Sequence, residues 1–135
     1  MTLTFDSAYP QLLNFYGSQS KLIDSGDHEG WAATFTDNGV FDSPTYQVPA
    51  EGREDLIRIS RKFQETAAQA GSAQRHVVVN ISVQKLAADG AEVSAYLLVT
   101  ASSHGKTEVL RIVNINDRIS FASGEPKVEL RRVQL

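Results

Sequence analysis

Chemistry in this sequence must come from carboxylates, histidines and hydroxyls, because the chain contains no cysteine. The absence of cysteine excludes disulfides, thiolate catalysis and every cysteine-ligated metal site. Gln19 and Asp24 lie on one flank of a predicted helix, and Gln19 interrupts its apolar stripe. A polar side chain on the buried side of a helix costs free energy unless it finds a partner, so these two residues indicate a polar pocket beneath the helix.

Histidine titrates near neutral pH and is the usual acid–base residue, and the chain has three of them. His76 opens a run of β-branched residues, whereas His28 and His104 fall at predicted turns. His76 can be interpreted as an ordinary strand-end residue or as an acid–base group that faces a wet cavity. A β-bulge can exchange the two faces of a strand, so periodicity alone leaves both interpretations open. The three histidines share no metal-ligand spacing, and no metal site is predicted.

Acidic and amide side chains supply further candidates. Asp24 can bond the backbone at its own helix end, but an acid there opposes the helix dipole, so another group is expected to hold it. Asp42 is the second acidic side chain expected to point inward. Asn114 and Asn116 interrupt an apolar strand, and one of them is expected to face the cavity. The aromatic residues expected in the core or the cavity wall are Tyr16, Trp31, Phe41, Tyr46 and Tyr96.

Helices are expected first along the chain, and strands after them. Apolar spacing predicts helices over residues 6–24, 28–35 and 54–70. A brief strand over 40–43 is followed by a loop over 43–52, which holds two prolines and is expected to form the rim or lid of a cavity. Alternating β-branched residues then predict strands over 76–86, 93–101, 107–121 and 127–133.

This order of elements indicates an α+β fold in which the helices pack on one face of an antiparallel meander. A strongly curved sheet covered in this way forms a cone. An apolar hollow with a few polar groups is the usual form of a small-molecule site, so the cone is the expected binding site. Residues 1–135 are expected to form this single domain.

Composition narrows the possible partners. A formal net charge of −3 with scattered basic residues argues against a nucleic-acid binder, since phosphate recognition needs clustered lysine and arginine. Arg131 and Arg132 form a tight pair on the last strand and are expected on an exposed or interface face. No apolar run reaches the roughly 18 residues of a membrane span, and no secretory signal is recognisable, so a cytoplasmic protein without membrane contact is expected.

Five segments, in order along nearly the whole chain, resemble one known family. They are LIDSGDHEGWAATFTDNGVFDSP, GREDLIRISRKF, QRHVVVNISV, VLRIVNINDRISF and KVELRRVQL. By these segments the chain is similar to the SnoaL-like cyclases and dehydratases of the nuclear transport factor 2-like superfamily. The resemblance implies a cone-shaped α+β barrel that dimerises through its sheet, uses no cofactor and holds a small hydrophobic substrate.

The resemblance also implies roles for individual residues. Asp24 matches an aspartate that ends the first helix in bile-acid 7α-dehydratase and scytalone dehydratase, and His76 matches a histidine that opens the strand after the third helix. Gln19 stands where the bile-acid enzyme has a tyrosine. Leu97 stands where scytalone dehydratase has a second histidine, after a tyrosine that resembles Tyr96. The implied catalytic pair is therefore His76 as acid and base, with Asp24 orienting it.

The resulting interpretation is a cofactor-independent enzyme that cyclises, dehydrates or isomerises a polyketide-like or steroid-like molecule. Gln19, Tyr96 and Asn114 are the expected hydrogen-bond donors to a developing enolate. Further expected substrate contacts are Tyr16, Trp31, Phe41, Asp42 and Tyr46. One alternative is a binding or dimerisation module without catalysis, because one fold serves unrelated tasks. Another is a ring-opening epoxide hydrolase, which needs an arginine between two aspartates such as Asp24 and Asp42.

Overall fold

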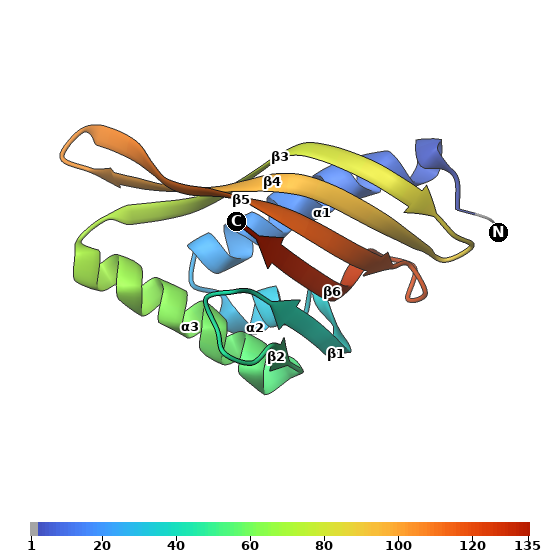
Figure 1. Ribbon diagram of the computed structural model, residues 1–135, viewed down its shortest axis with the longest axis horizontal. Helices are drawn as coiled ribbons and strands as arrows, with labels where there is room; N and C mark the ends of the chain where they lie inside the picture. Colours follow the sequence, from blue (N-terminus) through green and yellow to red (C-terminus); the bar gives the residue numbers. More distant parts are fainter. Residues whose placement is uncertain (1–2) are drawn as a thin grey trace.

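Three helices and a six-stranded sheet make up residues 3–135, the part of the chain that the computed structural model describes. The helices are α1 (Phe5–Asp24), α2 (His28–Ala32) and α3 (Arg53–Ala70). The strands are β1 (Phe35–Asp42), β2 (Ala50–Glu51), β3 (Ala73–Leu86), β4 (Gly90–Ser103), β5 (Lys106–Ser120) and β6 (Lys127–Gln134). The long strands β3 to β5 form an elongated upper layer, and α2 and α3 lie below it (Figure 1). Among residues 3–135, none of the helices has the length and apolar character that a membrane span requires.

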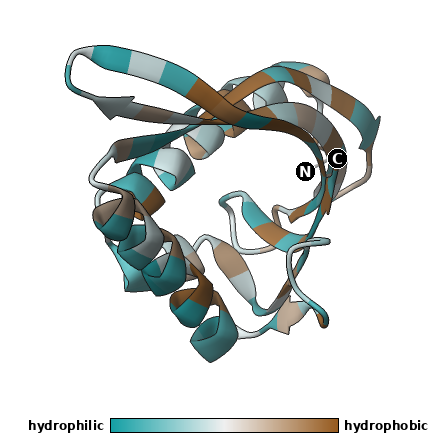
Figure 2. Ribbon diagram, turned by 60° about the vertical axis from the view of Figure 1, so that its left-hand side comes forward, coloured by the Kyte–Doolittle hydropathy of each residue, from teal (hydrophilic) through white to brown (hydrophobic). Residues whose placement is uncertain are grey.

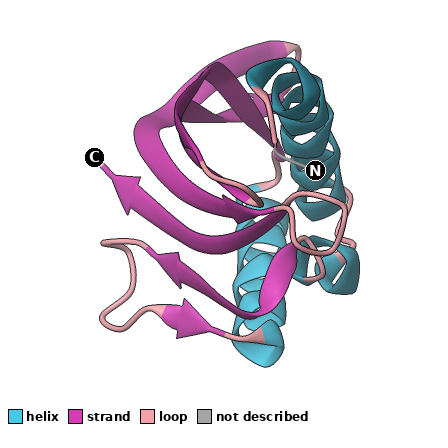
Figure 3. Cartoon of the chain, turned by 90° about the vertical axis from the view of Figure 1, so that its right-hand side faces the viewer, coloured by secondary structure: helices cyan, strands magenta, loops and turns pink. Residues whose placement is uncertain are grey.

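The sheet has the strand order β2-β1-β6-β5-β4-β3. Strands β3 to β6 pair antiparallel as consecutive hairpins, which confirms the predicted meander. Strand β1 instead runs parallel to β6, so the N-terminal half of the chain adds two strands to the far side of the sheet. Figure 3 shows the strands curving toward the helices. The fold is therefore the predicted α+β arrangement, with a sheet that is extended by β1 and β2.

Helix α1 begins at a capping box and buries one face. The Thr4 hydroxyl accepts from the backbone of Ser7 at 3.2 Å, and Ser7 Oγ accepts from the backbone of Thr4 at 3.1 Å. The buried face carries Ala8, Leu12, Phe15, Tyr16, Gln19 and Ile23. Gln19 is thus a polar interruption of a buried stripe, as the sequence predicts, and its partners must lie inside the domain.

Helix α2 is shorter than predicted, because it ends at Ala32 and Phe35 already belongs to β1. Strand β1 also begins earlier than the strand predicted over 40–43 and runs through residues 37–39. Its register against β6 shifts between Phe35 and Val40, so this added part of the strand is locally irregular. The longer strand buries Phe35 against Trp31, with 5.0 Å between the ring centroids.

Buried and exposed residues alternate along β4, and its buried row is apolar, so the inner face of the sheet is apolar there. Figure 2 shows hydrophobic segments recurring along the curved strands. Strand β3 keeps its apolar residues inward only with the help of a bulge. Its pairing with β4 shifts between Val79 and Ser82, where Asn80 has a φ of 54°. The bulge lets Val78 before it and Ile81 after it pack against the same core. His76, two residues before Val78, therefore lies on the inner side.

Gly52 precedes helix α3 in a backbone conformation that other residues avoid. Its φ is 84° and its ψ is 172°, a combination that is essentially restricted to glycine. We expect Gly52→Ala to lower the free energy of unfolding by about 1–3 kcal/mol through backbone strain. Steric clash is not the cause, since the nearest atom to a new Cβ would be the Asp37 carbonyl oxygen at 3.9 Å. Urea unfolding followed by circular dichroism measures the loss.

Gly17 provides the matched control for this substitution. It lies inside α1, and nothing lies within 4 Å of a Cβ built on it. Gly17→Ala should therefore leave stability unchanged or raise it by up to about 1 kcal/mol, because alanine is the better helix former. Similar losses in both variants would contradict the strain at Gly52.

Candidate active site

Asp24, the last residue of α1, meets His76 near the start of β3. The His76 ring nitrogen Nδ1 lies 2.8 Å from Asp24 Oδ1. The backbone N–H of His76 also donates to both carboxylate oxygens of Asp24, at 3.1 Å each. Only 15% of the His76 side chain and 18% of the Asp24 side chain are exposed. An ionised carboxylate can only accept hydrogen bonds, so Nδ1 carries a proton toward Asp24, and Nε2 is the imidazole nitrogen left for other partners.

Asp24 holds this position because β3 is the last strand of the sheet. One edge of β3 has no neighbouring strand, and its backbone groups need other partners. Helix α1 supplies two of them: Asp24 accepts from the N–H of His76, and the Tyr9 hydroxyl donates to the carbonyl of Ile81 at 3.2 Å. Asp24 thus accepts its hydrogen bonds from β3. The other role that the sequence allowed was a bond to the backbone at the end of its own helix.

An inner cavity of about 70 Å³ lies between the helices and the sheet, and His76 forms part of its wall. The Phe63 ring closes one side, with its centroid 4.4 Å from that of the His76 ring. Trp31 and Phe41 also line the cavity, as the sequence predicts. The remaining lining residues are Gln19, Ser20, Ile23, Ile59, Val78, Leu97 and Arg131. The cavity is therefore mostly apolar, with a few polar groups.

A larger outer hollow of about 450 Å³ runs between α1 and β3. It shares Ser20, His76 and Val78 with the inner cavity, so His76 stands between the two spaces. Small-molecule sites usually measure about 300–1,000 Å³, and an engineered apolar cavity that binds benzene measures about 150 Å³. The inner cavity alone is therefore smaller than a typical ligand site, because apolar core side chains fill much of the space between the helices and the sheet.

A buried hydrogen-bond network forms the polar part of the cavity wall. Its centre is an ion pair between Arg131 and Asp117, which face each other across β6 and β5. Arg131 donates from Nε to Asp117 Oδ1 at 2.9 Å and from Nη2 to Asp117 Oδ2 at 2.8 Å. Arg131 Nη2 also donates to Gln19 Oε1 at 2.7 Å, and the Tyr16 hydroxyl donates to Asp117 Oδ2 at 2.8 Å. The network thereby joins α1 to the last two strands.

Gln19 and Tyr16 were both expected to contact substrate, and both have their polar groups engaged in this network. The Gln19 side-chain amide donates to Thr34 Oγ1 at 2.8 Å, while its oxygen accepts from Arg131. Neither the Gln19 amide nor the Tyr16 hydroxyl is therefore a free donor for a developing enolate, and the prediction for Gln19 is wrong in this respect. Gln19 still lines the inner cavity, and Tyr16 lines the outer hollow.

Arg131 is buried, with 5% of its surface exposed, so its predicted place on an exposed face is wrong. Adjacent strand residues point to opposite faces, and Arg131 takes the inner face while Arg132 takes the outer one. Asp117 lies in the buried row of β5 with Val113 and Ile115. That row was the signal available in the sequence, because a carboxylate spaced among buried apolar residues requires a buried partner.

Burial and mutual contact shift two ionisable groups of the network. Removal from water raises the pKa of the Tyr16 hydroxyl well above its usual value, and the charge of Asp117 raises it further. Burial on its own lowers the pKa of Arg131, but the charge and hydrogen bonds of Asp117 outweigh that effect and raise it. Tyr16 is therefore a neutral donor and Arg131 a charged one at neutral pH.

Asp42 and Tyr46 are predicted site residues that do not line the inner cavity. Asp42 ends β1 with a partly exposed side chain, and its Oδ2 lies 3.6 Å from Arg132 Nε. Tyr46 packs edge-on against Phe41, with 6.4 Å between centroids, but it lines a separate hollow formed by the loop after β1 and by α3. The prediction that these side chains reach the site is wrong because β1 ends at the surface.

Tyr96 and Asn114 are cross-strand neighbours on the outer face of the sheet. Tyr96 is 47% exposed, and it alternates with buried Leu97 on β4. Asn116 is outward as well and donates to Gln134 Oε1 at 3.1 Å. The prediction that Tyr96 and one of the two asparagines face the cavity is wrong, because strand alternation places them opposite the buried row.

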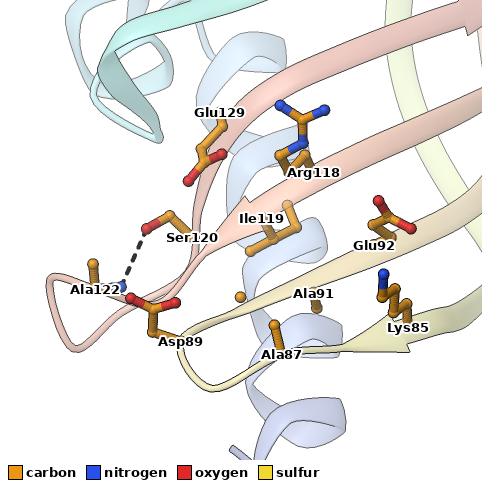
Figure 4. A pocket seen from close by; sticks show the side chains of 11 residues that line it. Lys85, Ala87, Asp89, Ala91, Glu92, Arg118, Ile119, Ser120, Ala122 and Glu129 are labelled. Carbon is orange, nitrogen blue, oxygen red and sulfur yellow. Dashed lines mark hydrogen bonds between the residues drawn. The ribbon is translucent and has the colours of Figure 1, made fainter.

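Another hollow, of about 320 Å³, lies where β3 turns into β4, at the end of β3 away from His76 (Figure 4). Mostly exposed side chains of both charge signs line it, among them Lys85, Glu92, Arg118 and Glu129. It contains none of the predicted site residues. Within residues 3–135, no group of three or more ligating side chains is placed to hold a metal ion.

The α+β fold is shared with a solved protein that is described as NTF2-like. A solved protein from Novosphingobium aromaticivorans, described as NTF2-like with a cystatin-like fold, matches with a TM-score of 0.81 at 16% identity, covering 94% of this chain and 80% of that one. The family model of the SnoaL-like domain matches residues 7–132. The chain belongs to this SnoaL-like family.

Two further solved structures show how closely the fold is shared. Aln2 from a Streptomyces species matches with a TM-score of 0.86 at 22% identity, over 99% of this chain and 94% of that chain. A protein from Catenulispora acidiphila in complex with S-DNPA matches with a TM-score of 0.80 at 23% identity, over 95% and 94% of the two chains. No curated protein matches the sequence.

The ion pair between Asp117 and Arg131 yields a stability prediction. We expect Asp117→Asn to lower the free energy of unfolding by about 3–5 kcal/mol, because it leaves a buried guanidinium charge without its counter-ion. The measurement is urea unfolding at neutral pH. Arg58→Gln is the control, since it removes an exposed ion pair with Asp55 and should cost less than about 1 kcal/mol. An Asp117→Asn loss as small as that of the control would show that the buried pair does not stabilise the fold.

Proposed function

We propose that this protein is a cofactor-independent cyclase, dehydratase or isomerase of a hydrophobic, polyketide-like or steroid-like small molecule. The observation that carries the proposal is the 2.8 Å contact between Asp24 and His76 at the wall of an apolar cavity. A shielded imidazole oriented by a carboxylate is the arrangement that general acid–base catalysis requires. Membership of the SnoaL-like family, identified through residues 7–132, supports a small-molecule substrate.

The chemistry follows from the protonation of His76. Its Nδ1–H stays hydrogen-bonded to Asp24, and Nε2 takes a proton from the carbon next to a substrate carbonyl. The electron pair of the broken C–H bond moves into the carbonyl and gives an enolate. In an isomerisation, Nε2–H returns the proton to another carbon. In a dehydration, the enolate reforms the carbonyl, the β-hydroxyl leaves, and Nε2–H protonates it to water. Asp24 stabilises the imidazolium in both cases.

The size of the two spaces constrains how a substrate binds. A polycyclic molecule exceeds the inner cavity of about 70 Å³, so only its reacting end enters there. The rest of the molecule occupies the outer hollow between α1 and β3, which His76 also lines. The complex of the similarly folded Catenulispora acidiphila protein with S-DNPA supports ligand binding by a fold of this kind.

Two alternatives are less well supported. A non-catalytic binding module is favoured by the small inner cavity but gives no chemical role to the His76 ring that Asp24 orients at the cavity wall. A ring-opening hydrolase needs two aspartates and an arginine around one water. Asp42 has a partly exposed side chain beside Arg132 and does not line the inner cavity, so Asp24 and Asp42 do not converge on one water.

The proposed proton transfer can be measured without knowing the natural substrate. We expect the wild-type protein to accelerate exchange of the α-hydrogens of 1-tetralone, a bicyclic ketone, with deuterium from heavy water, followed by NMR. His76→Gln should lower the accelerated rate by about 100-fold or more, because the base is lost. Asp24→Asn should lower it less, because an amide oxygen can still accept one hydrogen bond from His76.

His104→Gln is the control, because His104 lies in the exposed turn between β4 and β5. It should exchange at the wild-type rate. A wild-type rate equal to that of buffer, or a His76→Gln rate equal to wild type, would refute catalysis by His76 and favour the binding module.

We also propose that the chain forms a homodimer through the outer face of its sheet. Val77, Leu98 and Ile112 form a cross-strand row on β3, β4 and β5, next to Tyr96. Ile112 is 59% exposed, and Val77 and Tyr96 are also exposed. A contiguous apolar patch of this kind on a sheet is typical of an interaction surface.

The dimer predicts a specific effect of charge on this face. Ile112→Lys should convert the protein to a monomer, because it buries an unpaired charge in the interface. Light scattering coupled to size exclusion measures the mass. Val48→Lys is the control, since Val48 is exposed on the loop after β1, and it should leave the mass unchanged. A wild-type protein of monomer mass would refute the dimer directly.

A further inference from the structure

The guanidinium of Arg131 has more donors than its protein partners use. Its Nε and one Nη2 hydrogen bind Asp117, and the second Nη2 hydrogen binds Gln19. Among residues 3–135, Nη1 makes no hydrogen bond, so its two N–H groups are available to a ligand. The Tyr16 and Phe35 rings flank the guanidinium, each with its centroid 5.9 Å from Cζ. An arginine with 5% of its surface exposed would rarely leave a donor unused without a purpose.

The space that these donors face follows from two observations. No side-chain nitrogen or oxygen in residues 3–135 is both fully enclosed and without a hydrogen-bond partner. Because Nη1 has no partner, it must border accessible space, and Arg131 lines the inner cavity together with His76. A fixed pair of N–H donors thus shares a small apolar space with the imidazole.

The charge balance of the network limits what these donors can bind. Asp117 already neutralises Arg131, and Tyr16 is a neutral donor to the same carboxylate. A carboxylate ligand would leave a net negative charge in a buried space, which is costly. A neutral carbonyl oxygen needs no counter-ion and accepts strongly from a charged donor.

We infer that Arg131 is the oxygen-binding residue of this site and that the cavity selects ligands that present a carbonyl oxygen to Nη1. The inference rests on the proposed function, because it places the carbonyl next to the carbon that His76 deprotonates. As the electron pair of the C–H bond moves to that oxygen, the fixed guanidinium stabilises the growing negative charge. This is the role expected of Gln19, Tyr96 and Asn114 from the sequence, and Arg131 takes it instead.

Trp31 allows the inference to be tested by binding alone. It is the chain's only tryptophan, it is buried, and it lines the inner cavity, so its fluorescence reports on the occupancy of that cavity. The probes are cyclopentanone and methylenecyclopentane, which have nearly the same shape but differ in having an oxygen or a CH₂ group. Only the C=O or C=CH₂ end of each probe enters the inner cavity, and the ring stays in the outer hollow. Each is titrated against the wild-type protein and against Arg131→Lys. Lysine keeps a positive charge beside Asp117, but its single ammonium nitrogen lacks the planar, forked donor groups of a guanidinium.

We expect Arg131→Lys to weaken cyclopentanone binding by about tenfold or more while changing methylenecyclopentane binding by less than about twofold, since only the ketone loses a charge-assisted hydrogen bond. If Arg131→Lys does not fold, the neutral pair Arg131→Gln with Asp117→Asn replaces it and should give the same selective loss. An unchanged ratio of the two dissociation constants in a folded variant overturns the inference. Failure of cyclopentanone to perturb Trp31 in the wild-type protein also overturns it.

His76→Gln separates this inference from the proposed function. It should abolish the exchange of 1-tetralone hydrogens but leave the ratio of the two probe affinities within about twofold of wild type, because it removes no donor from Nη1. A selective loss in Arg131→Lys without any wild-type exchange supports oxygen binding and refutes proton transfer. Exchange that depends on His76, with no selective loss in Arg131→Lys, refutes oxygen binding alone.

Discussion

A buried arginine must be neutralised and hydrogen-bonded, and this requirement organises the interior of the domain. Asp117 supplies the counter-charge from the neighbouring strand, and Gln19 and Tyr16 reach the ion pair from α1. Thr34, just before β1, completes the chain of contacts through Gln19. One ionic interaction therefore fixes the position of the first helix over the last two strands, and it leaves a polar patch in an otherwise apolar wall.

The open edge of the sheet imposes the second constraint. Strand β3 has a strand neighbour on one side only, and α1 covers part of its other edge with Asp24 and Tyr9. The same carboxylate that accepts from the backbone of His76 also accepts from its ring. In the proposed reaction, structural and chemical roles coincide in Asp24, because the contact that closes the sheet edge also orients the imidazole at the cavity wall. A carboxylate in this position is accounted for by the fold even before catalysis is considered.

The cavity between these two constraints is small, and this bears on how the site works. Cone-like sheets bind ligands when their interior stays open, but here Ile59, Phe63 and Leu97 occupy much of it. The substrate of the proposed reaction therefore inserts an end and leaves its bulk in the outer hollow. In the proposed reaction, three features meet at that end: the imidazole, the guanidinium and an apolar wall. Electrostatic interactions are stronger in such an environment than in water.

The sequence by itself determined the order of the helices and of every strand except β2, the meander and the buried polar position at Gln19, because these follow from local periodicity. Resemblance to the SnoaL-like family, rather than periodicity, linked Asp24 to His76. Only the tertiary structure decided that β1 runs parallel to β6, that Arg131 and Asp117 face inward, and that Tyr96 and Asn114 face outward. The physical reason is that successive side chains on a strand point to opposite faces, and this pattern does not show which face the helices cover. Bulges, such as the one at Asn80, can also exchange those faces along a single strand.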